Sequence, residues 1–242
     1  MHDHQSFKEL KAAARKSLEG NYGHAISLFI TTELLSLLPA YIVLFLFSGN
    51  SLFNNICSEI VSFILSVFLQ VLHIGVCLFY MKIQCNQQAN ISDLFYGFKS
   101  NTNTFFKLGL LFAAISTATN LPALVLSYIS EDLILIYCAL LGGILVNFLL
   151  VVPIRQSSYI LLDFPDSTTK QALLMSIRIM KKHYWRYVML ILSFIPLILI
   201  CFLCCGVGLL WVTPYMNATL TALYFDLIRH NKNTQSKIDI HI

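Results

Sequence analysis

Long apolar runs separated by short polar connections dominate this chain. A helix needs about 20 mostly apolar residues to cross the hydrocarbon core of a bilayer, and the backbone must be helical there because lipid offers no partner for a free amide. The runs that meet this length are 24–47, 56–82, 106–129, 133–155, 187–205 and 207–228. The pattern predicts an all-α polytopic membrane protein with six transmembrane helices in a single membrane domain, 1–242.

Three polar segments carry apolar residues at helical spacing beside basic ones. They predict amphipathic helices over 5–19, 91–99 and 167–183 that lie in the plane of the lipid headgroups, with Ser167 as the N-cap of the third. The expected apolar faces are Phe7, Leu10, Ala14 and Leu18; Ile91, Leu94, Phe95 and Phe98; and Leu173, Leu174, Ile177 and Met180.

Each of these segments precedes two predicted spans. The chain is therefore expected to repeat one module three times, an interfacial helix followed by a hairpin of two membrane helices, and to end in a cytoplasmic tail, 230–242. Repeats of this kind occur in transporters, and they also occur in proteins that transport nothing.

All sixteen Lys and Arg residues fall in the N-terminal segment, the second and fourth connections or the C-terminal tail. The positive-inside rule therefore predicts that both termini are cytoplasmic. Asp226 and Arg229 are expected to pair with each other or to reach the interface. The cations expected to contact anionic headgroups of the inner leaflet, at about 1 kcal/mol each, are Lys8, Lys11, Arg15, Lys170, Arg178, Lys181, Lys182 and Arg186.

The composition agrees with a bilayer as the solvent. The chain is 57% hydrophobic and 12% charged, whereas soluble domains carry roughly 25% charged residues. A net charge of +4 without a long basic run or a nucleic-acid-binding motif argues against a nucleic-acid partner. Seven scattered cysteines argue against a disulfide framework. The Cys201, Cys204 and Cys205 cluster is expected to pack in the membrane, and neither a metal nor a cofactor is predicted.

Ionisable residues inside a membrane are candidates for function. Glu33 stands near the middle of the first span, either as a proton or cation site or as a protonated carboxyl bonded to a neighbouring helix. Gln70 and His73 share one face of the second span, and Asn120 and Asn147 lie in the third and fourth. These five could converge on one ligand or ion pocket, or they could be separate interhelical hydrogen bonds of roughly 0.6 kcal/mol each.

Motifs of soluble enzyme chemistry are missing from the sequence. There is no Walker loop, dinucleotide fingerprint, HExxH or GxSxG elbow, and no catalytic residue is predicted. An intramembrane enzyme acting on lipid would require His24, His183, Asp163 or Asp166 to cluster near a headgroup-sized opening. The Ala139 and Gly143 pair has the small-xxx-small spacing of close helix packing.

Short motifs along nearly the whole chain resemble a bacterial family of integral membrane proteins of unknown function, domain of unknown function 975. The matching motifs are Leu10-Lys11-Ala12-Ala13-Ala14-Arg15, Gly20-Asn21-Tyr22-Gly23-His24-Ala25-Ile26, Met180-Lys181-Lys182-His183-Tyr184-Trp185-Arg186, and Gly208-Leu209-Leu210-Trp211-Val212-Thr213-Pro214-Tyr215 with Thr219, Ala222 and Tyr224. The family typically has Gly-x-Trp where this chain has Gly20-Asn21-Tyr22.

The resemblance implies a multi-pass protein of the bacterial cytoplasmic membrane and supplies no catalytic residues. That family resembles, more distantly, the membrane domain attached to some glycerophosphodiester phosphodiesterases. No catalytic phosphodiesterase domain accompanies it in these 242 residues, so the activity does not carry over.

The leading hypothesis is a non-enzymatic membrane protein that binds lipid or a hydrophobic or peptide ligand, as an accessory to export or to envelope stress protection. Its partners would be membrane lipids, with a membrane-protein partner or a homo-oligomer left open. The alternatives are a small proton- or cation-coupled transporter or channel, in which the five polar residues share one water-accessible cavity, and the lipid-modifying enzyme.

Overall fold

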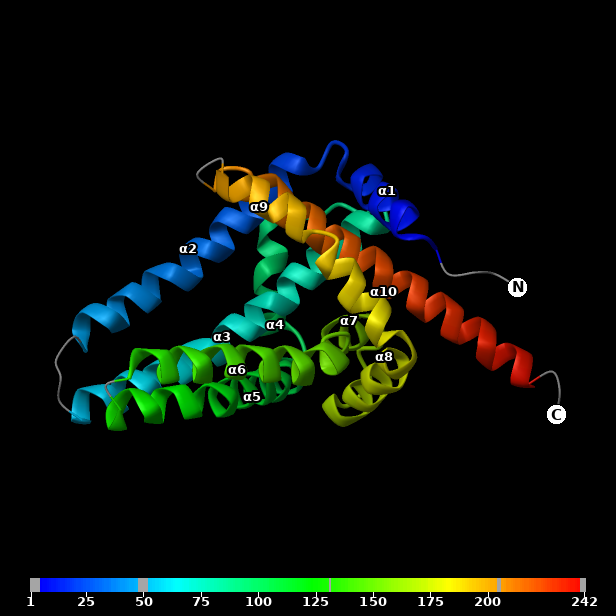
Figure 1. Ribbon diagram of the computed structural model, residues 1–242. Coiled ribbons are helices and arrows are strands. Elements are labelled where there is room, and N and C mark those ends of the chain that lie inside the picture. The colour runs from blue at the N-terminus through cyan, green and yellow to red at the C-terminus, as the bar shows by residue number, and fades with distance from the viewer. Residues whose placement is uncertain (1–4, 48–51, 131, 204–205, 240–242) are drawn as a thin grey trace. The chain divides into compact units, whose positions relative to one another are not determined.

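The computed structural model describes residues 5–47, 52–130, 132–203 and 206–239. These ranges contain helices and short connections and no strand, which confirms the all-α prediction (Figure 1). The α-helices are α1 (Phe7–Leu18), α2 (Tyr22–Leu46), α3 (Leu52–Gln84), α4 (Tyr96–Lys99), α5 (Thr102–Ile129), α6 (Leu133–Val151), α7 (Ser157–Asp163), α8 (Thr169–Leu192), α9 (Ile195–Leu203) and α10 (Leu209–Asp239), and the 3-10 helices are η1 (Ile91–Phe95) and η2 (Val152–Ile154).

Five stretches of the described chain are long and apolar enough to cross a membrane. They are Tyr22–Leu46, Phe53–Gln84, Thr102–Ile129, Leu133–Asp163 and Thr169–Leu203. Each overlaps one of the first five predicted spans. The sixth predicted segment, 207–228, falls in α10, which is more polar because it carries Asn217 and Asp226 and continues through the predicted tail to Asp239.

The chain divides into two compact units. Unit 1 comprises Met1–Leu34, Ile74–Tyr96 and Arg178–Ile242, and unit 2 comprises Leu35–His73 and Gly97–Ile177. Helices α2, α3 and α8 each run from one unit into the other.

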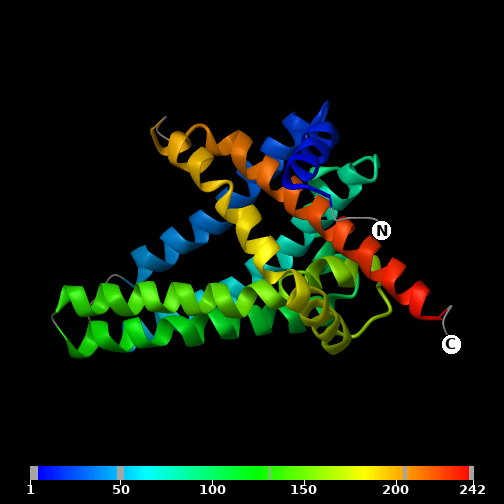
Figure 2. The ribbon, with the colours of Figure 1, turned by 45° about the vertical axis from the view of Figure 1, so that its right-hand side comes forward.

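In unit 1, the N-terminal helix α1 packs along α10 (Figure 2). Ser6 and Glu9 form a reciprocal capping box that starts α1. Leu10, Ala14 and Leu18 recur on one face, as predicted, and all three are fully buried. The apolar face of this amphipathic helix therefore contacts protein rather than lying free for the headgroup plane.

The second predicted interfacial helix, 91–99, is not one amphipathic helix. The segment forms the 3-10 helix η1 and the four-residue helix α4. Asp93 fixes η1, since its carboxylate accepts from the Asn90 backbone amide and pairs with Lys82 at 2.6 Å. The backbone carbonyl of Leu94 lies directly against Gly75 of α3, where any Cβ would overlap it. The tight turn brings the backbone onto α3 in a way that a regular helix would not.

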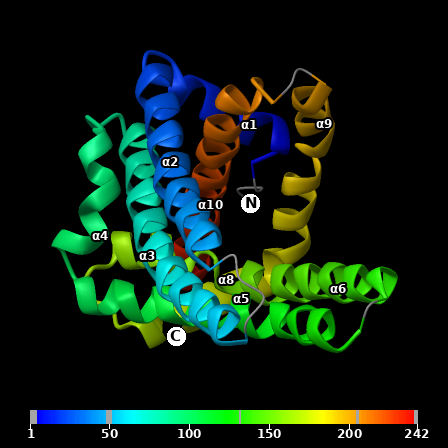
Figure 3. The same cartoon turned by 90° about the vertical axis from the view of Figure 1, so that its left-hand side faces the viewer.

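In unit 2, α5 and α6 lie side by side in all views (Figure 3). A Cβ built on Gly143 would stand 2.5 Å from the Thr119 carbonyl oxygen, whereas one on Gly142 would meet nothing within 4 Å. The predicted small-residue contact is therefore confirmed at Gly143. Helix α3 approaches α5 in the same manner, because a Cβ on Gly109 would lie 3.1 Å from the Val67 carbonyl oxygen.

Local interactions shift two predicted boundaries, the end of the fourth span and the start of the third interfacial helix. Pro153 lacks an amide proton and crowds the preceding turn, so α6 ends at Val151 and the chain passes through η2 into α7. At the start of α8 the N-cap is Thr168 rather than Ser167. The Thr168 hydroxyl accepts from the backbone amide of Gln171 at 3.3 Å, and the side-chain oxygen of Gln171 accepts from the backbone amide of Thr168 at 2.9 Å.

The third predicted interfacial helix and the fifth span form one continuous helix as far as Leu192, after which α9 begins at Ile195, next to Pro196. Ile179 and Met180 are buried on α8, while Leu174 and Ile177 remain exposed. The turn between α9 and α10 uses Gly206 at φ 78. Cys201 is buried there, and Cys204 and Cys205 lie outside the described residues.

Candidate functional site

Polar side chains recur along one face of α3 and one face of α5, inside segments that are otherwise apolar. Glu59, Ser62 and Ser66 follow one another at helical spacing on α3, and Ser116, Asn120 and Ser127 do so on α5. All six line a single pocket of about 460 Å³. This volume lies in the range of 300–1,000 Å³ that is typical of sites for small molecules.

Apolar side chains supply the rest of the wall. They come from all three helices of unit 2 that frame the pocket, and the larger ones are Phe63, Leu121, Leu124, Ile136 and Leu140. Among the described residues that line the pocket, Glu59 alone carries a charge. The pocket therefore combines an apolar body with a stripe of hydroxyls, one amide and one carboxylate.

Close helix contacts beside the pocket hold its walls in place. The contact of Gly109 with Val67 joins α5 to α3, and the contact of Gly143 with Thr119 joins α5 to α6. Asn147 of α6 adds a polar link, since its amide donates to the Ser116 hydroxyl at 3.2 Å and to the Thr119 hydroxyl at 3.1 Å. Ser116 thus connects the pocket lining to the α5–α6 interface.

Several of the polar lining groups have used their protons within their own helix. The Ser66 hydroxyl donates to the Phe63 carbonyl at 2.7 Å, and the Ser127 hydroxyl donates to the Leu124 carbonyl at 2.6 Å. The Asn120 amide nitrogen donates to the Ser116 carbonyl at 2.9 Å. A hydroxyl or amide that donates in this way keeps its oxygen lone pairs for other partners.

The structure brings together only part of the predicted five-residue pocket. Asn120 lines the pocket and Asn147 bonds to its wall. Gln70 packs beside Gly109, with its Cβ 3.5 Å from where a glycine Cβ would stand. His73 faces Arg155 instead, and Glu33 belongs to unit 1 with an exposed side chain.

The His73 contact fixes a tautomer. Its Nε2 lies 2.5 Å from Nη2 of Arg155. Arginine has donors only, so Nε2 must be the acceptor and the imidazole proton sits on Nδ1. His73 therefore serves to hold Arg155 at the end of η2 rather than to line the pocket.

Glu59 and the four serines of the pocket were not predicted as site residues. In the sequence, Glu59 is only an acidic residue near the end of a predicted span, and serine is common in membrane helices. The signal that could have found them is periodic. Hydroxyl, amide or carboxyl groups return every three or four residues on two separate apolar helices.

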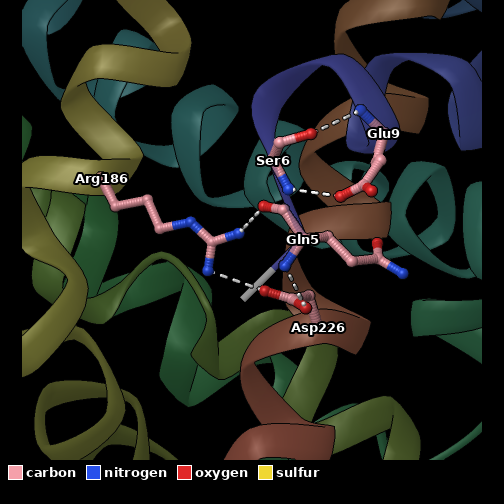
Figure 4. A network of polar contacts seen from close by, with 5 residues as sticks. All are labelled: Gln5, Ser6, Glu9, Arg186 and Asp226. Carbon is pink, nitrogen blue, oxygen red and sulfur yellow. Dashed lines mark hydrogen bonds and ion pairs between the residues drawn. The ribbon is translucent and has the colours of Figure 1, made fainter. Parts of the chain in front are cut away.

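A second polar cluster, in unit 1, ties three segments together (Figure 4). Arg186 of α8 pairs with Asp226 of α10 at 2.7 Å, and its other terminal nitrogen donates to the backbone carbonyl of Gln5. The backbone amide of Gln5 donates to the second carboxylate oxygen of Asp226 at 3.3 Å. The Arg186 side chain is 16% exposed and that of Asp226 is 9% exposed.

This cluster bears on two predictions. The Arg186 guanidinium contacts protein groups, and its contact with lipid headgroups stays a prediction. Asp226 pairs with Arg186 from α8, and Arg229 is exposed. A guanidinium beside two oxygen acceptors forms charge-assisted bonds stronger than those it would make to water.

Two more of the predicted headgroup cations contact protein groups. The Lys11 ammonium donates to the Ser193 carbonyl at 3.3 Å and lies 4.4 Å from the centre of the Phe194 ring. Arg15 lies 6.0 Å from the Tyr215 ring. Burial, and secondarily the charge of Arg15, lowers the pKa of Lys11.

The remaining predicted headgroup cations keep exposed side chains. These are Lys8, Lys170, Arg178, Lys181 and Lys182. Their contact with lipid stays a prediction.

The residues proposed for lipid chemistry are divided between the two units. His24 and His183 belong to unit 1, and Asp163 and Asp166 belong to unit 2. Within the described ranges there is no group of three or more His, Cys, Asp or Glu side chains that could hold a metal ion.

Comparison with known proteins gives one family. A family model described as "Protein of unknown function (DUF975)" matches residues 1–232. No curated protein and no solved structure matches the chain. The more distant likeness to the membrane domain of glycerophosphodiester phosphodiesterases therefore stays a prediction.

Proposed function

The chain belongs to the DUF975 family of proteins of unknown function, and from this premise we propose that it is an integral membrane protein that binds an amphiphile in the pocket between α3, α5 and α6. The observation that supports the proposal is the mixed lining. Apolar side chains from all three helices line the pocket together with Glu59, Asn120 and serine hydroxyls from α3 and α5. A ligand with an apolar body and a polar head would match both.

Because the surrounding solvent is lipid, the polar groups of the pocket determine whether a ligand prefers the pocket to the bilayer. Lipid chains are as apolar as leucine, so an apolar ligand gains little by leaving the bilayer for an apolar pocket. Hydrogen bonds and charge are what such a site can offer beyond lipid. The helices that frame the pocket, α3, α5 and α6, all belong to the stretches long and apolar enough to cross a membrane.

The proposed topology has six spans with both termini in the cytoplasm. The first five spans are the apolar stretches described above, and α10 supplies the sixth from Leu209 to Ile228. An odd number of spans would put Arg229, Lys232 and Lys237 on the opposite side from the other cations, against the positive-inside rule.

Reporter fusions test the topology. Alkaline phosphatase is active only outside the cytoplasm, and green fluorescent protein fused after residue 242 should fluoresce. A phosphatase inserted between Pro165 and Asp166 should be inactive, whereas one inserted at Glu131 should be active. An active phosphatase at Asp166 would refute the proposed orientation.

Native mass spectrometry of the detergent-purified chain tests ligand binding. Ala123 lines the pocket and is 7% exposed, so Ala123→Phe should fill the cavity and abolish retention of co-purified amphiphile. Ala118 lies on the same helix with an exposed side chain and does not line the pocket. Ala118→Phe is therefore the matched control and should retain the ligand. Equal retention by both variants would refute the site.

The same geometry gives more support to a binding function than to transport. A transporter built on the predicted polar residues would need Glu33, Gln70, His73, Asn120 and Asn147 in one cavity. Of these five residues, Asn120 is found among the described residues that line the pocket, and His73 contacts Arg155.

A further inference from the structure

We infer that the pocket selects a cationic amphiphile whose head carries hydrogen-bond donors, that is, a primary ammonium on an apolar chain. The inference rests on the proposed amphiphile site and names the class of ligand that its lining would prefer.

Charge is the first reason. Glu59 is acidic, and no lysine, arginine or histidine is found among the described lining residues. Glu59 is exposed, so its carboxylate attracts a cationic head group through partly screened charge. The same field repels the phosphate or carboxylate head of an anionic lipid.

The direction of the hydrogen bonds is the second reason. Ser66, Ser127 and Asn120 have each spent a donor on a carbonyl of their own helix. Their oxygen lone pairs stay available as acceptors, although Asn120 keeps a second N–H donor, and Glu59 when ionised has acceptors only. The wall is rich in acceptors on both of the helices that carry its polar stripes.

A primary ammonium is the complement of such a wall. It has one positive charge, three donors and no acceptor. A quaternary ammonium supplies the charge without donors, and a fatty alcohol supplies one donor without the charge. Comparing these three head groups on the same alkyl chain separates the effect of the charge from the effect of the hydrogen-bond donors.

Competition between matched amphiphiles tests the inference. The full-length protein in detergent would be offered equal concentrations of dodecylamine, dodecyltrimethylammonium and dodecanol at pH 7, and the adducts would be counted by native mass spectrometry. Dodecylamine should exceed each of the others by about tenfold, the ratio expected for one charge-assisted hydrogen bond.

Two variants locate the preference. Glu59→Gln keeps the size of the side chain and should bring the dodecylamine to dodecanol ratio close to one. Ser66→Ala removes a single acceptor and should lower the ratio only partly. Glu19→Gln makes the same chemical change at the exposed C-cap of α1, outside the pocket, and should leave the ratio unchanged.

The outcomes separate the two proposals. If all three amphiphiles bind equally and Ala123→Phe blocks them all, the amphiphile site stands and the inferred head group is wrong. If Glu59→Gln leaves the preference intact, the inferred role of its charge is overturned. If no amphiphile binds, both the proposed function and this inference fail.

Discussion

Arg186 and Asp226 form an ion pair of 2.7 Å between α8 and α10, with side chains 16% and 9% exposed. The same guanidinium holds the backbone carbonyl of Gln5, just before α1. From the sequence, Arg186 is expected to be a surface cation beside a membrane span, but in the structure it links three segments of the protein. It joins the start of the chain to two helices that are more than 180 residues away.

Removing one partner of this pair should be costly. Arg186→Leu leaves the Asp226 carboxylate buried without its cation, a loss of about 3–5 kcal/mol for buried pairs. The free energy of unfolding in mixed micelles should fall accordingly, and hydrogen exchange in α1 should accelerate. Arg178 on the same helix is exposed, so Arg178→Leu should change either measurement little. Equal effects of the two variants would contradict the assigned role.

Gly143 should tolerate no larger residue, unlike its neighbour. A Cβ at Gly143 would press on the Thr119 carbonyl, whereas a Cβ at Gly142 would meet open space. Overpacking of this kind costs about 1–3 kcal/mol, so Gly143→Ala should lower the midpoint of thermal unfolding. Gly142→Ala should leave it unchanged or raise it, since alanine favours the helix by about 1 kcal/mol. A stabilised Gly143→Ala protein would refute the close contact.

Lys11 should make stability depend on pH in the alkaline range. Its pKa in the folded protein is lowered from the ordinary value of 10.5, first by burial and then by Arg15. Between the folded and unfolded pKa values the unfolded chain binds more protons, so stability rises with pH. The cost of desolvating the partly buried ammonium is present at lower pH and is relieved as pH rises toward 10.5.

The measurement is a difference between two proteins. The free energy of unfolding of the wild type, minus that of Lys11→Met, should increase as pH rises from about 8 to 10. Other titrating groups are common to both proteins and cancel. A flat difference would show that Lys11 titrates as an ordinary lysine.

Asp93→Asn should loosen the turn between α3 and α5. It removes the partner of Lys82 at 2.6 Å and weakens the acceptor that caps η1. The pair is partly exposed, so the expected loss is about 1 kcal/mol. Faster backbone hydrogen exchange over Ile91–Phe95 is the sensitive readout. Asp166→Asn, at an exposed residue, is the control and should not alter exchange in this turn.

The helices could be predicted from sequence because length and hydropathy determine them. The buried face of α1 at Leu10, Ala14 and Leu18 was also predictable, because apolar periodicity defines a face. What that face contacts was not, because periodicity does not distinguish lipid from α10. Turn chemistry likewise moved one boundary by a residue, since Thr168 and Gln171 satisfy each other whereas the Ser167 hydroxyl donates back to the Phe164 carbonyl.

The candidate site could be predicted only in part. Asn120 stood out because an amide is rare in an apolar run, and it lines the pocket. Glu59 did not, because its importance comes from the helices that surround it. The partner of His73 is Arg155, 82 residues away. Contacts of that separation depend on how helices pack, and no local pattern contains them.

Arg186 and Asp226 contact residue 5 only through hydrogen bonds to its backbone carbonyl and amide. The pair therefore recognises where the polypeptide stands and not which residue occupies that place. Any amino acid except proline, which has no amide proton to give, would serve there equally well. The identity of the side chain at this position therefore carries no record of the two contacts that its backbone makes.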